Sequence, residues 1–299
     1  MLIFRQNKIE LCKIFQVQIF ITSLFLHCTL SESSNCTFRI ENGVTYVENK
    51  GNLNFDEKKI TVVPTLKIVM NESVGGEIVA SVRDVAVDNH NNIYVADNAN
   101  SRIVVFDSTG NYKQAFGRKG KGPGEFSSIN SMDFSEEGLL YVLDRQLRRI
   151  SIFDSTGSCI NSFTCRQMCM DFAVKDAKEI FITLFPIAAK EGIVAIYDSS
   201  GKEIRSFIEK SETISKVAMT GELGGVTYFN NTIYYVHPYP YRIEQYSRDG
   251  ILSRAILFER QGQKGIEDVL STSFNISVLR TNLNSIYILQ KDMLLTHVT

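Results

Sequence analysis

The chain has 299 residues, of which 44% are hydrophobic and 22% are charged, and its formal net charge is −1 at pH 7. These proportions are ordinary for a chain that buries a core, and they exclude a disordered or collagen-like protein. The small net charge excludes a protein that binds polyanions through its overall charge, so any electrostatic recognition must come from a local patch.

The first 30 residues have the order of an export signal. Three basic residues within the first 13 precede an apolar run at 14–26, which is shorter than the roughly 20 apolar residues of a membrane-spanning helix. Cys28 closes this run, as the lipidated cysteine does in bacterial lipoprotein signals. The sequence therefore predicts an extracytoplasmic protein, periplasmic or at the cell surface, tethered to the membrane by a lipid on Cys28 or by an uncleaved anchor. Cleavage around 31–34 is the alternative.

Four cysteines follow the export segment, namely Cys36, Cys159, Cys165 and Cys169. Their spacing is not that of a paired zinc motif, and no histidine lies near the last three. Buried or free thiols are therefore expected, and a disulfide among the last three stays open for an exported protein. No cofactor is predicted, although a divalent cation such as calcium also stays open.

Two landmarks recur along the chain at similar distances. An aromatic residue in an apolar strand pattern occurs at intervals of 40 to 53 residues, at Tyr94, Tyr141, Phe181, Tyr234 and Tyr287. A turn that ends in glycine recurs at intervals of 44 to 49 residues, beginning at Asp107, Asp154, Asp198 and Ser247. Two landmarks that recur at similar intervals, in units of four short strands, are typical of β-propeller blades.

The sequence thus predicts an all-β fold, a β-propeller of four-stranded antiparallel blades. The propeller would occupy 59–299, after the export segment at 1–30 and a linker at 31–58. Its blades are expected near 84–116, 131–163, 170–207 and 225–258, with a partial blade at 275–299. About five blades are represented, so either the ring has five blades or the carboxyl end of a six-bladed ring is missing.

The stretch at 84–107, DVAVDNHNNIYVADNANSRIVVFD, resembles the NHL repeat, in which an apolar strand and a turn precede Asn-Ile-Tyr-Val-Ala-Asp, Arg-Ile and Phe-Asp. The likeness extends to exported six-bladed propellers of bacteria, many of them lipoproteins. The resemblance therefore implies export and six blades, of which this chain would lack one. It does not choose among the family's functions in sensing, scaffolding, binding and catalysis.

In such a propeller, the linkers between blades and the turns between second and third strands emerge on one face. That face would carry a basic and aromatic rim made of Arg118, Lys119, Lys121, Arg145, Arg148, Phe185, Lys190, His237, Tyr239 and Tyr241. A rim of this kind suits an anionic or carbohydrate-like ligand, with cations for charge and tyrosines for stacking. Solvated turn residues without a ligand are the alternative.

Sequence motifs of catalysis are missing, since there is no G-x-S-x-G elbow, phosphate loop or paired histidine motif in the sequence. Asp97 and Asp144, which close the second strands of their blades, are expected to bond backbone amides in their own hairpins rather than to act as site carboxylates or calcium ligands. The favoured function is a non-catalytic binding or scaffold propeller for a protein, peptide or glycan, with no nucleic-acid partner. The alternatives are a metal-dependent hydrolase or lyase at the central channel, and a sensor domain.

Overall fold

The computed structural model describes residues 3–4, 36–49, 66–67, 73–74, 77–219, 224–237, 242–258, 286–288 and 294–296. These residues divide into two compact units, one with three four-stranded sheets and the other with most of a six-stranded sheet. Three further pairs of short antiparallel strands lie outside these sheets. They are β1 (Ile3–Phe4) with β4 (Leu66–Lys67), β5 (Ser73–Val74) with β6 (Glu77–Ile78), and β25 (Ile286–Ile288) with β26 (Leu294–Thr296).

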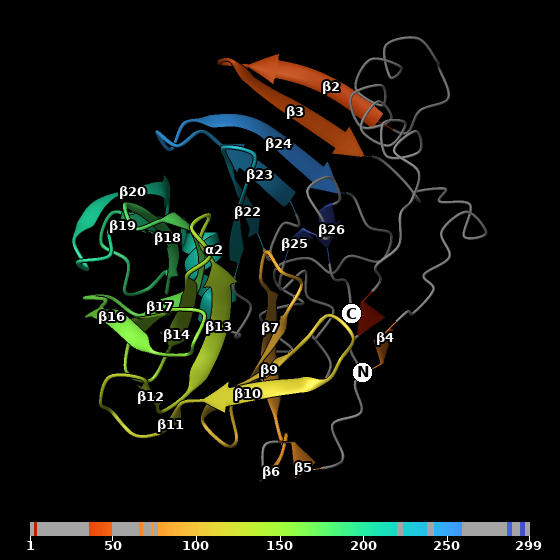
Figure 1. The fold of residues 1–299 in the computed structure, drawn as a ribbon. Coiled ribbons are helices and arrows are strands. Elements are labelled where there is room, and N and C mark those ends of the chain that lie inside the picture. Colours follow the sequence, from red (N-terminus) through yellow and green to blue (C-terminus); the bar gives the residue numbers. More distant parts are fainter. Residues whose placement is uncertain are drawn as a thin grey trace. The chain divides into compact units, whose positions relative to one another are not determined.

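The first unit consists of three antiparallel meanders of four strands each (Figure 1). The first sheet holds β7 (Val82–Val87), β8 (Ile93–Asp97), β9 (Arg102–Phe106) and β10 (Tyr112–Phe116). The second holds β13 (Ile129–Phe134), β14 (Leu140–Asp144), β15 (Arg149–Phe153) and β16 (Cys159–Thr164). The third holds β17 (Cys169–Asp176), β18 (Glu179–Leu184), β19 (Gly192–Tyr197) and β20 (Glu203–Glu209). Between the first two sheets lie β11 (Arg118–Lys119) and β12 (Glu125–Phe126), which pair in parallel.

The fourth blade consists of β21 (Gly225–Phe229), β22 (Thr232–His237), β23 (Arg242–Tyr246) and β24 (Leu252–Phe258). Its last three strands belong to the second unit, whereas Val226–Tyr228 of β21 belong to the first. The sequence predicts a linker over 31–58, but this prediction is wrong for residues 36–49. They form a hairpin of β2 (Cys36–Glu41) and β3 (Val44–Asn49), and β3 pairs in parallel with β24. The fourth sheet therefore has six strands in the order β2-β3-β24-β23-β22-β21.

A short helix precedes β21, although the sequence reading expects only strands. This helix, α2 (Glu212–Met219), begins after Ser211, whose hydroxyl accepts a hydrogen bond from the amide of Ile214 at 3.1 Å. Such a serine cap satisfies an amide that has no partner inside the helix. No helix in the described part of the chain is long and apolar enough to span a membrane. The export segment around Cys28 lies outside the described residues.

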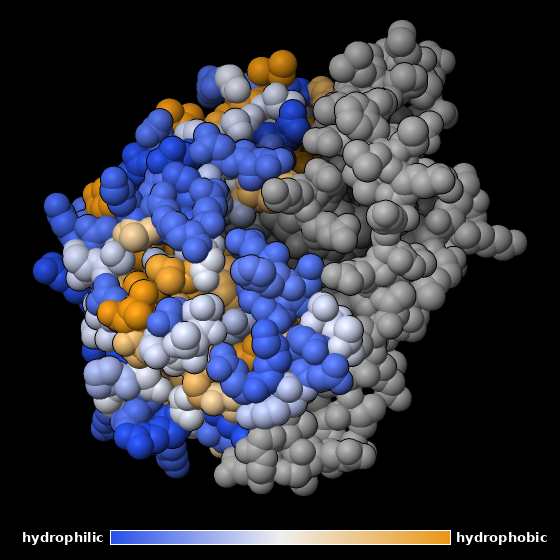
Figure 2. All heavy atoms as spheres, viewed as in Figure 1, coloured by the Kyte–Doolittle hydropathy of each residue, from blue (hydrophilic) through white to orange (hydrophobic). Residues whose placement is uncertain are grey.

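The middle strands of the blades are largely apolar, with one charged residue at an end of each of β8, β9 and β14. In β8, β9 and β14 every residue is buried, which is expected where other elements cover both faces of a sheet. One core cluster joins Tyr94 and Ile103 of the first blade to Leu140 and Phe153 of the second. The face drawn in Figure 2 is mostly hydrophilic, with hydrophobic residues in small patches, as is normal for a protein surface.

The outermost strand of each of the four blades carries a β-bulge at the same place, directly after the residue that opens its pairing. The residues left out of register are Lys113, Ile160, Ile204 and Ser253. A bulge increases the twist of an edge strand and so opposes pairing with another chain in the first three blades, whereas β24 of the fourth blade pairs with β3 despite its bulge. The repeat thus preserves the bulge as well as the strands.

Candidate functional site

The first strands of three consecutive blades lie side by side, with β13 between β7 and β17. Each has a bulge near its start, and the residues out of register are Arg83, Asn130 and Met170. These bulges contact one another. The Arg83 guanidinium donates to Asn130 Oδ1 at 3.0 Å, and Asn130 Nδ2 donates to the carbonyl of Met170 at 2.7 Å. Bulges are common beside functional sites because they redirect side chains.

Three carboxyl groups follow this line of bulges, and we call Asp84, Asp133 and Asp171 the inner-strand cluster. Each is half-buried, and each accepts a hydrogen bond from a backbone amide in the first strand of the following blade. The donors are Met132 for Asp84 at 2.6 Å, Val174 for Asp133 at 2.8 Å, and Val226 for Asp171. The cluster therefore joins successive blades through side-chain to backbone bonds, which satisfy amides at strand edges.

The same three carboxyl groups hold protons unusually well. Burial raises the pKa of Asp84 and of Asp133 to about 7 and that of Asp171 to about 6, although the backbone amides oppose the rise. The nearby negative charge of Asp171 adds to the rise at both Asp84 and Asp133. Each group can therefore gain or lose a proton near neutral pH, which is a property of acid–base sites as well as of buried structural carboxyls.

In the described ranges, no group of three or more His, Cys, Asp or Glu side chains is placed to hold a metal ion. The carboxyl groups of the inner-strand cluster are distributed over three strands. They bind amides of neighbouring strands rather than converging on one point.

The predicted rim is partly as expected. Its cations Arg118, Lys119, Lys121, Arg145, Arg148 and Lys190 are exposed, and we call these six residues the basic rim. Phe185 is half-buried, whereas His237 is fully buried, so its prediction as a surface ligand-binding residue is wrong. Tyr239 and Tyr241 lie outside the described residues.

Hydrogen bonds connect the loops of the basic rim in sequence order. Arg149, the first residue of β15, donates to the carbonyls of Lys121 and Glu125 at 2.6 and 2.5 Å, which ties the start of β15 to the linker before β13. Further on, Gln167 of the next linker accepts from the amide of Lys190 at 3.2 Å. Hydrogen bonds thereby connect loops that carry cations far apart in the sequence.

Arg145 connects the basic rim to the inner-strand cluster. Burial lowers the pKa of Arg145, and the positive charge of Arg83 lowers it further. The charge of Arg83 also acts on Asp84 and Asp171, whose pKa values it lowers. The charges of Arg83 and Arg145 thus repel each other, and a nearby anion would relieve this repulsion.

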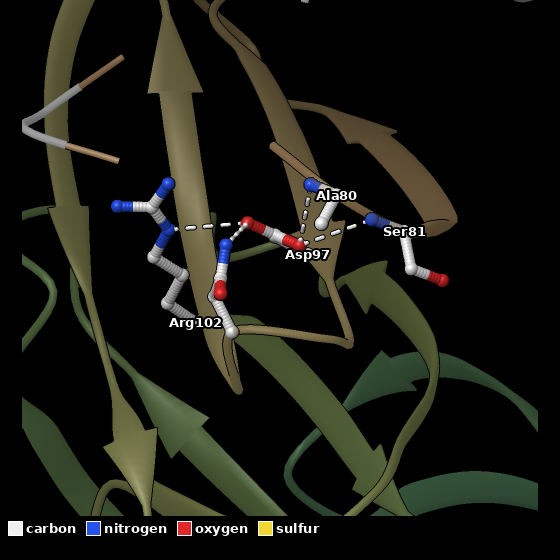
Figure 3. A network of polar contacts seen from close by, with 5 residues as sticks. Ala80, Ser81, Asp97 and Arg102 are labelled. Atoms are coloured by element: carbon white, nitrogen blue, oxygen red, sulfur yellow. Dashed lines mark hydrogen bonds and ion pairs between the residues drawn. The ribbon is translucent and has the colours of Figure 1, made fainter. Parts of the chain in front are cut away.

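Asp97 was expected to bond backbone amides, and Figure 3 shows this arrangement. One oxygen accepts from the amides of Ala80 and Ser81, both at 3.3 Å, and the other accepts from Asn100 Nδ2 at 2.8 Å and Arg102 Nε at 3.2 Å. The side chain is fully buried. Asp97 therefore fastens the segment before β7 to the turn after β8, as a structural carboxylate does.

Asp144 has the same position in the second blade and the same kind of amide partners. It accepts from the amides of Ser127, Ser128 and Leu147 at 2.6, 3.1 and 2.9 Å. The arginine opposite it, Arg149, donates to linker carbonyls instead. Both aspartates thus bond backbone amides, but the prediction that these lie in their own hairpins holds only for the Leu147 amide at Asp144. The other amides belong to the preceding segment in each case.

His237 replaces these aspartates in the fourth blade, because it pairs with Arg242 as Asp97 pairs with Arg102. Its Nε2 lies 2.5 Å from Glu244 Oε2, which also accepts from the Tyr246 hydroxyl at 2.5 Å. Arg242 Nε donates to the other oxygen of Glu244 at 2.7 Å. In the fourth blade the buried carboxylate is therefore that of Glu244 on the third strand, β23, whereas in the first two blades it lies on the second strand.

The charge state of this network follows from its contacts. Burial raises the pKa of Glu244, but the bonds with His237, Arg242 and Tyr246 outweigh burial and hold it at about 2. Burial lowers the pKa of His237 more than Glu244 raises it. The histidine is therefore neutral at pH 7 and donates its Nε2 proton to the carboxylate, and Nδ1 is buried without a partner in the described ranges.

Comparison with solved structures supports the fold alone, because all identities are low. A protein from Bacteroides fragilis NCTC 9343 that is described by name as exported shares 15% sequence identity with this chain. The match covers 65% of this chain and 55% of that protein, with a TM-score of 0.53. An inactive virginiamycin B lyase from Staphylococcus aureus with quinupristin is 14% identical over 57% and 54%, with a TM-score of 0.43. BBS1N in complex with ARL6DN is 12% identical over 61% and 54%, with a TM-score of 0.45. The chain spans about half the length of these structures.

A search of the curated proteins found no significant match. The fold is an all-β propeller with four-stranded antiparallel blades, as predicted; the finer assignment to the NHL repeat stays a prediction. Residues 78–296, which include nearly all of the described propeller, match the model of one family. The chain therefore belongs to the family described as Domain of unknown function (DUF4934).

Proposed function

We propose that this chain is an exported binding propeller whose basic rim takes an acidic segment of a partner protein, without chemistry of its own. The observation that carries the proposal is the row of exposed cations on loops that hydrogen bonds connect from one blade to the next. A row of fixed cations suits carboxylates presented along an extended chain, because each contact is charge-assisted.

The charges of the rim are largely free to meet a ligand. Arg118 forms an ion pair with Glu125 at 2.8 Å, but the other five cations of the basic rim have no ion pair with a described carboxylate. Arg145 also faces the charge of Arg83. A negatively charged ligand would gain attraction here without first breaking an ion pair.

An acidic peptide fits the described rim better than a glycan does. Sugars are usually held by exposed aromatic faces together with hydrogen-bonding groups. The one aromatic residue of the predicted rim that the structure describes, Phe185, is half-buried. The described part of the rim therefore offers charge rather than stacking surfaces.

The test is binding of the full chain to fluorescently labelled poly-L-glutamate at several salt concentrations. Replacing Arg118, Lys121 and Arg145 by glutamine should weaken binding at least tenfold and flatten its salt dependence. A matched variant with Lys113, Lys178 and Lys202 replaced by glutamine loses the same charge from exposed sites away from the rim, and it should bind within about twofold of the wild type. Equal losses in both variants would contradict a specific rim.

A carboxylated polysaccharide tested in the same way separates the two partner classes. Rim-dependent binding of the polysaccharide, with none of the polypeptide, would replace the acidic protein by an anionic glycan. No rim-dependent binding of either probe would remove the basic rim from the function of this protein.

A second candidate, a hydrolase or lyase that acts at the inner-strand cluster, is favoured by one observation, namely the near-neutral pKa values of its carboxyl groups. A carboxyl group of this kind serves as a general acid or base at physiological pH. Metal analysis of the purified full chain, with Asp133→Asn for comparison, tests the metal-dependent form. A stoichiometric divalent ion that the variant loses would support this candidate.

A further inference from the structure

Cys165 and Cys169 flank the linker between the second and third blades. Cys165 directly follows β16, and Cys169 is the first residue of β17. Both are free, buried thiols, with exposures of 1% and 0%, and the Cys165 thiol lies close enough to that of Cys169 to raise its pKa. Cys169 Sγ also lies 3.6 Å from the carbonyl of Gln167 inside the linker. The linker thus turns back so that its two ends bring both sulfur atoms together.

Cys159 has no such neighbour. It begins β16, while Cys165 follows the end of the same strand, and six residues of extended chain span about 20 Å. The Cα atoms of a disulfide lie no more than about 7 Å apart. Cys159 cannot therefore pair with Cys165, and its own sulfur contacts the carbonyl of Asn161 at 3.5 Å.

We propose that Cys165 and Cys169 form a disulfide when the chain folds in an oxidising compartment. The oxidant is a disulfide of a small thiol or of a thiol–disulfide oxidoreductase. One cysteine thiolate attacks this disulfide to give a mixed disulfide, and the second cysteine then displaces the reduced carrier thiol. One S–S bond forms in the protein and one breaks in the oxidant, which takes up two electrons and two protons.

The timing of this reaction follows from the surroundings of the thiols. The nearby thiol of Cys165, together with burial, raises the pKa of the Cys169 thiol above its ordinary value. A thiol that resists ionisation and lies away from solvent is a poor nucleophile. The disulfide therefore forms during folding, before the linker packs, and is protected from reductants afterwards.

The proposed disulfide would fix the position of Gln167, which contacts the basic rim at Lys190. Gln167, within the linker, donates to Glu203 at 3.3 Å and accepts from the amide of Lys190 at 3.2 Å. A disulfide across the linker holds Gln167 between these two partners. The inference goes beyond the proposed function, because it requires neither a ligand nor the basic rim.

Trypsin distinguishes the pairing sharply, because it cleaves after Arg166, between the two cysteines. The full chain is reduced, denatured, refolded in glutathione redox buffer, and then blocked with N-ethylmaleimide without reductant. We expect the peptides 150–166 and 167–175 as one disulfide-linked species, two hydrogen atoms lighter than their sum, with Cys159 alkylated. Dithiothreitol should separate the two peptides.

Two variants serve as controls. Cys159→Ser should keep the linked species, and Cys169→Ser should release both peptides, with near-native circular dichroism in each case. Recovery of wild-type 150–166 and 167–175 as separate peptides with all three thiols alkylated would overturn the proposal. A link between Cys159 and Cys165 within one peptide would overturn it as well.

Discussion

Asp133 accepts a hydrogen bond from the amide of Val174 in the next blade at 2.8 Å, and burial raises the pKa of its carboxyl group to about 7. An unfolded aspartate titrates near 4. Between these pH values the folded protein therefore holds more protons than the unfolded chain. The resulting stabilisation is complete below about pH 4 and is lost as the pH rises through about 7.

For this carboxyl group we expect the free energy of unfolding to fall between pH 4 and 7 with a slope on the order of 1 kcal/mol per pH unit. Asp133→Asn should remove that part of the slope, because an amide does not titrate. Urea unfolding at closely spaced pH values measures the slope. Glu137→Gln, at an exposed position, is the control and should leave it unchanged; an equal slope in Asp133→Asn and wild type would refute the assignment.

The network around His237 predicts that restoring the residue of the first two blades is harmful. His237→Asp would place a second carboxylate against Glu244, which is buried and already accepts two other hydrogen bonds. We expect a loss of about 3 kcal/mol in the free energy of unfolding, because one buried charge loses its donor. Combining this change with Glu244→Gln should recover most of the loss. Denaturant titration of the two single variants and the double variant measures the coupling.

Asp97 and Asp144 predict unequal effects of the same substitution. Asp97→Asn removes the negative partner of the buried Arg102 guanidinium, and we expect a loss of about 3 kcal/mol. Asp144→Asn affects only bonds to neutral amides, and we expect about 1 kcal/mol. Chemical denaturation of the two variants gives the difference. A larger loss for Asp144→Asn would show that the ion pair of Asp97 contributes little.

The turn glycine of the second blade also packs against the first blade. Gly157 has φ of +84°, and a Cβ atom there would lie 2.6 Å from the ring of Phe116. Gly157→Ala therefore combines an unfavourable backbone conformation with overpacking, together about 3 kcal/mol. Gly43 has φ of +79°, and no described atom lies within 4 Å of its added Cβ, so Gly43→Ala should cost only about 1 kcal/mol. Thermal unfolding compares the two; equal effects would exclude the contact with Phe116.

The sequence sufficed for the strands because their signals are local. The predicted ranges of the first two blades, 84–116 and 131–163, begin and end within two residues of the observed sheets, which span 82–116 and 129–164. The rim cations were also predictable, because their loops follow from the strand order. His237 was misplaced because the buried partner that explains it, Glu244, lies on the next strand. Comparing the blades would have shown that the fourth has a carboxylate where the first two have none, since Val104 and Ser151 occupy the position of Glu244.

The inner-strand cluster could not be predicted from spacing. Asp133 lies two residues further along its strand than Asp84 and Asp171 do, since these two pair with Ala96 and Thr183, and Asp133 pairs with Tyr141. The three carboxyl groups influence one another only because their strands lie side by side. An alignment of the repeats therefore places them in different columns, and each looks like an isolated surface aspartate.

The parallel pairing of β3 with β24 has a consequence for the order of folding. The sheets β7–β10, β13–β16 and β17–β20 each form from one continuous stretch, so each can assemble as soon as its residues are available. Thr45 finds its partner Arg254 only after the whole intervening chain has been made. In a chain that emerges amino end first, the hairpin β2–β3 appears first but joins its sheet last. Until then the edge of β3 is open, and this interval is when the protein is most exposed to aggregation.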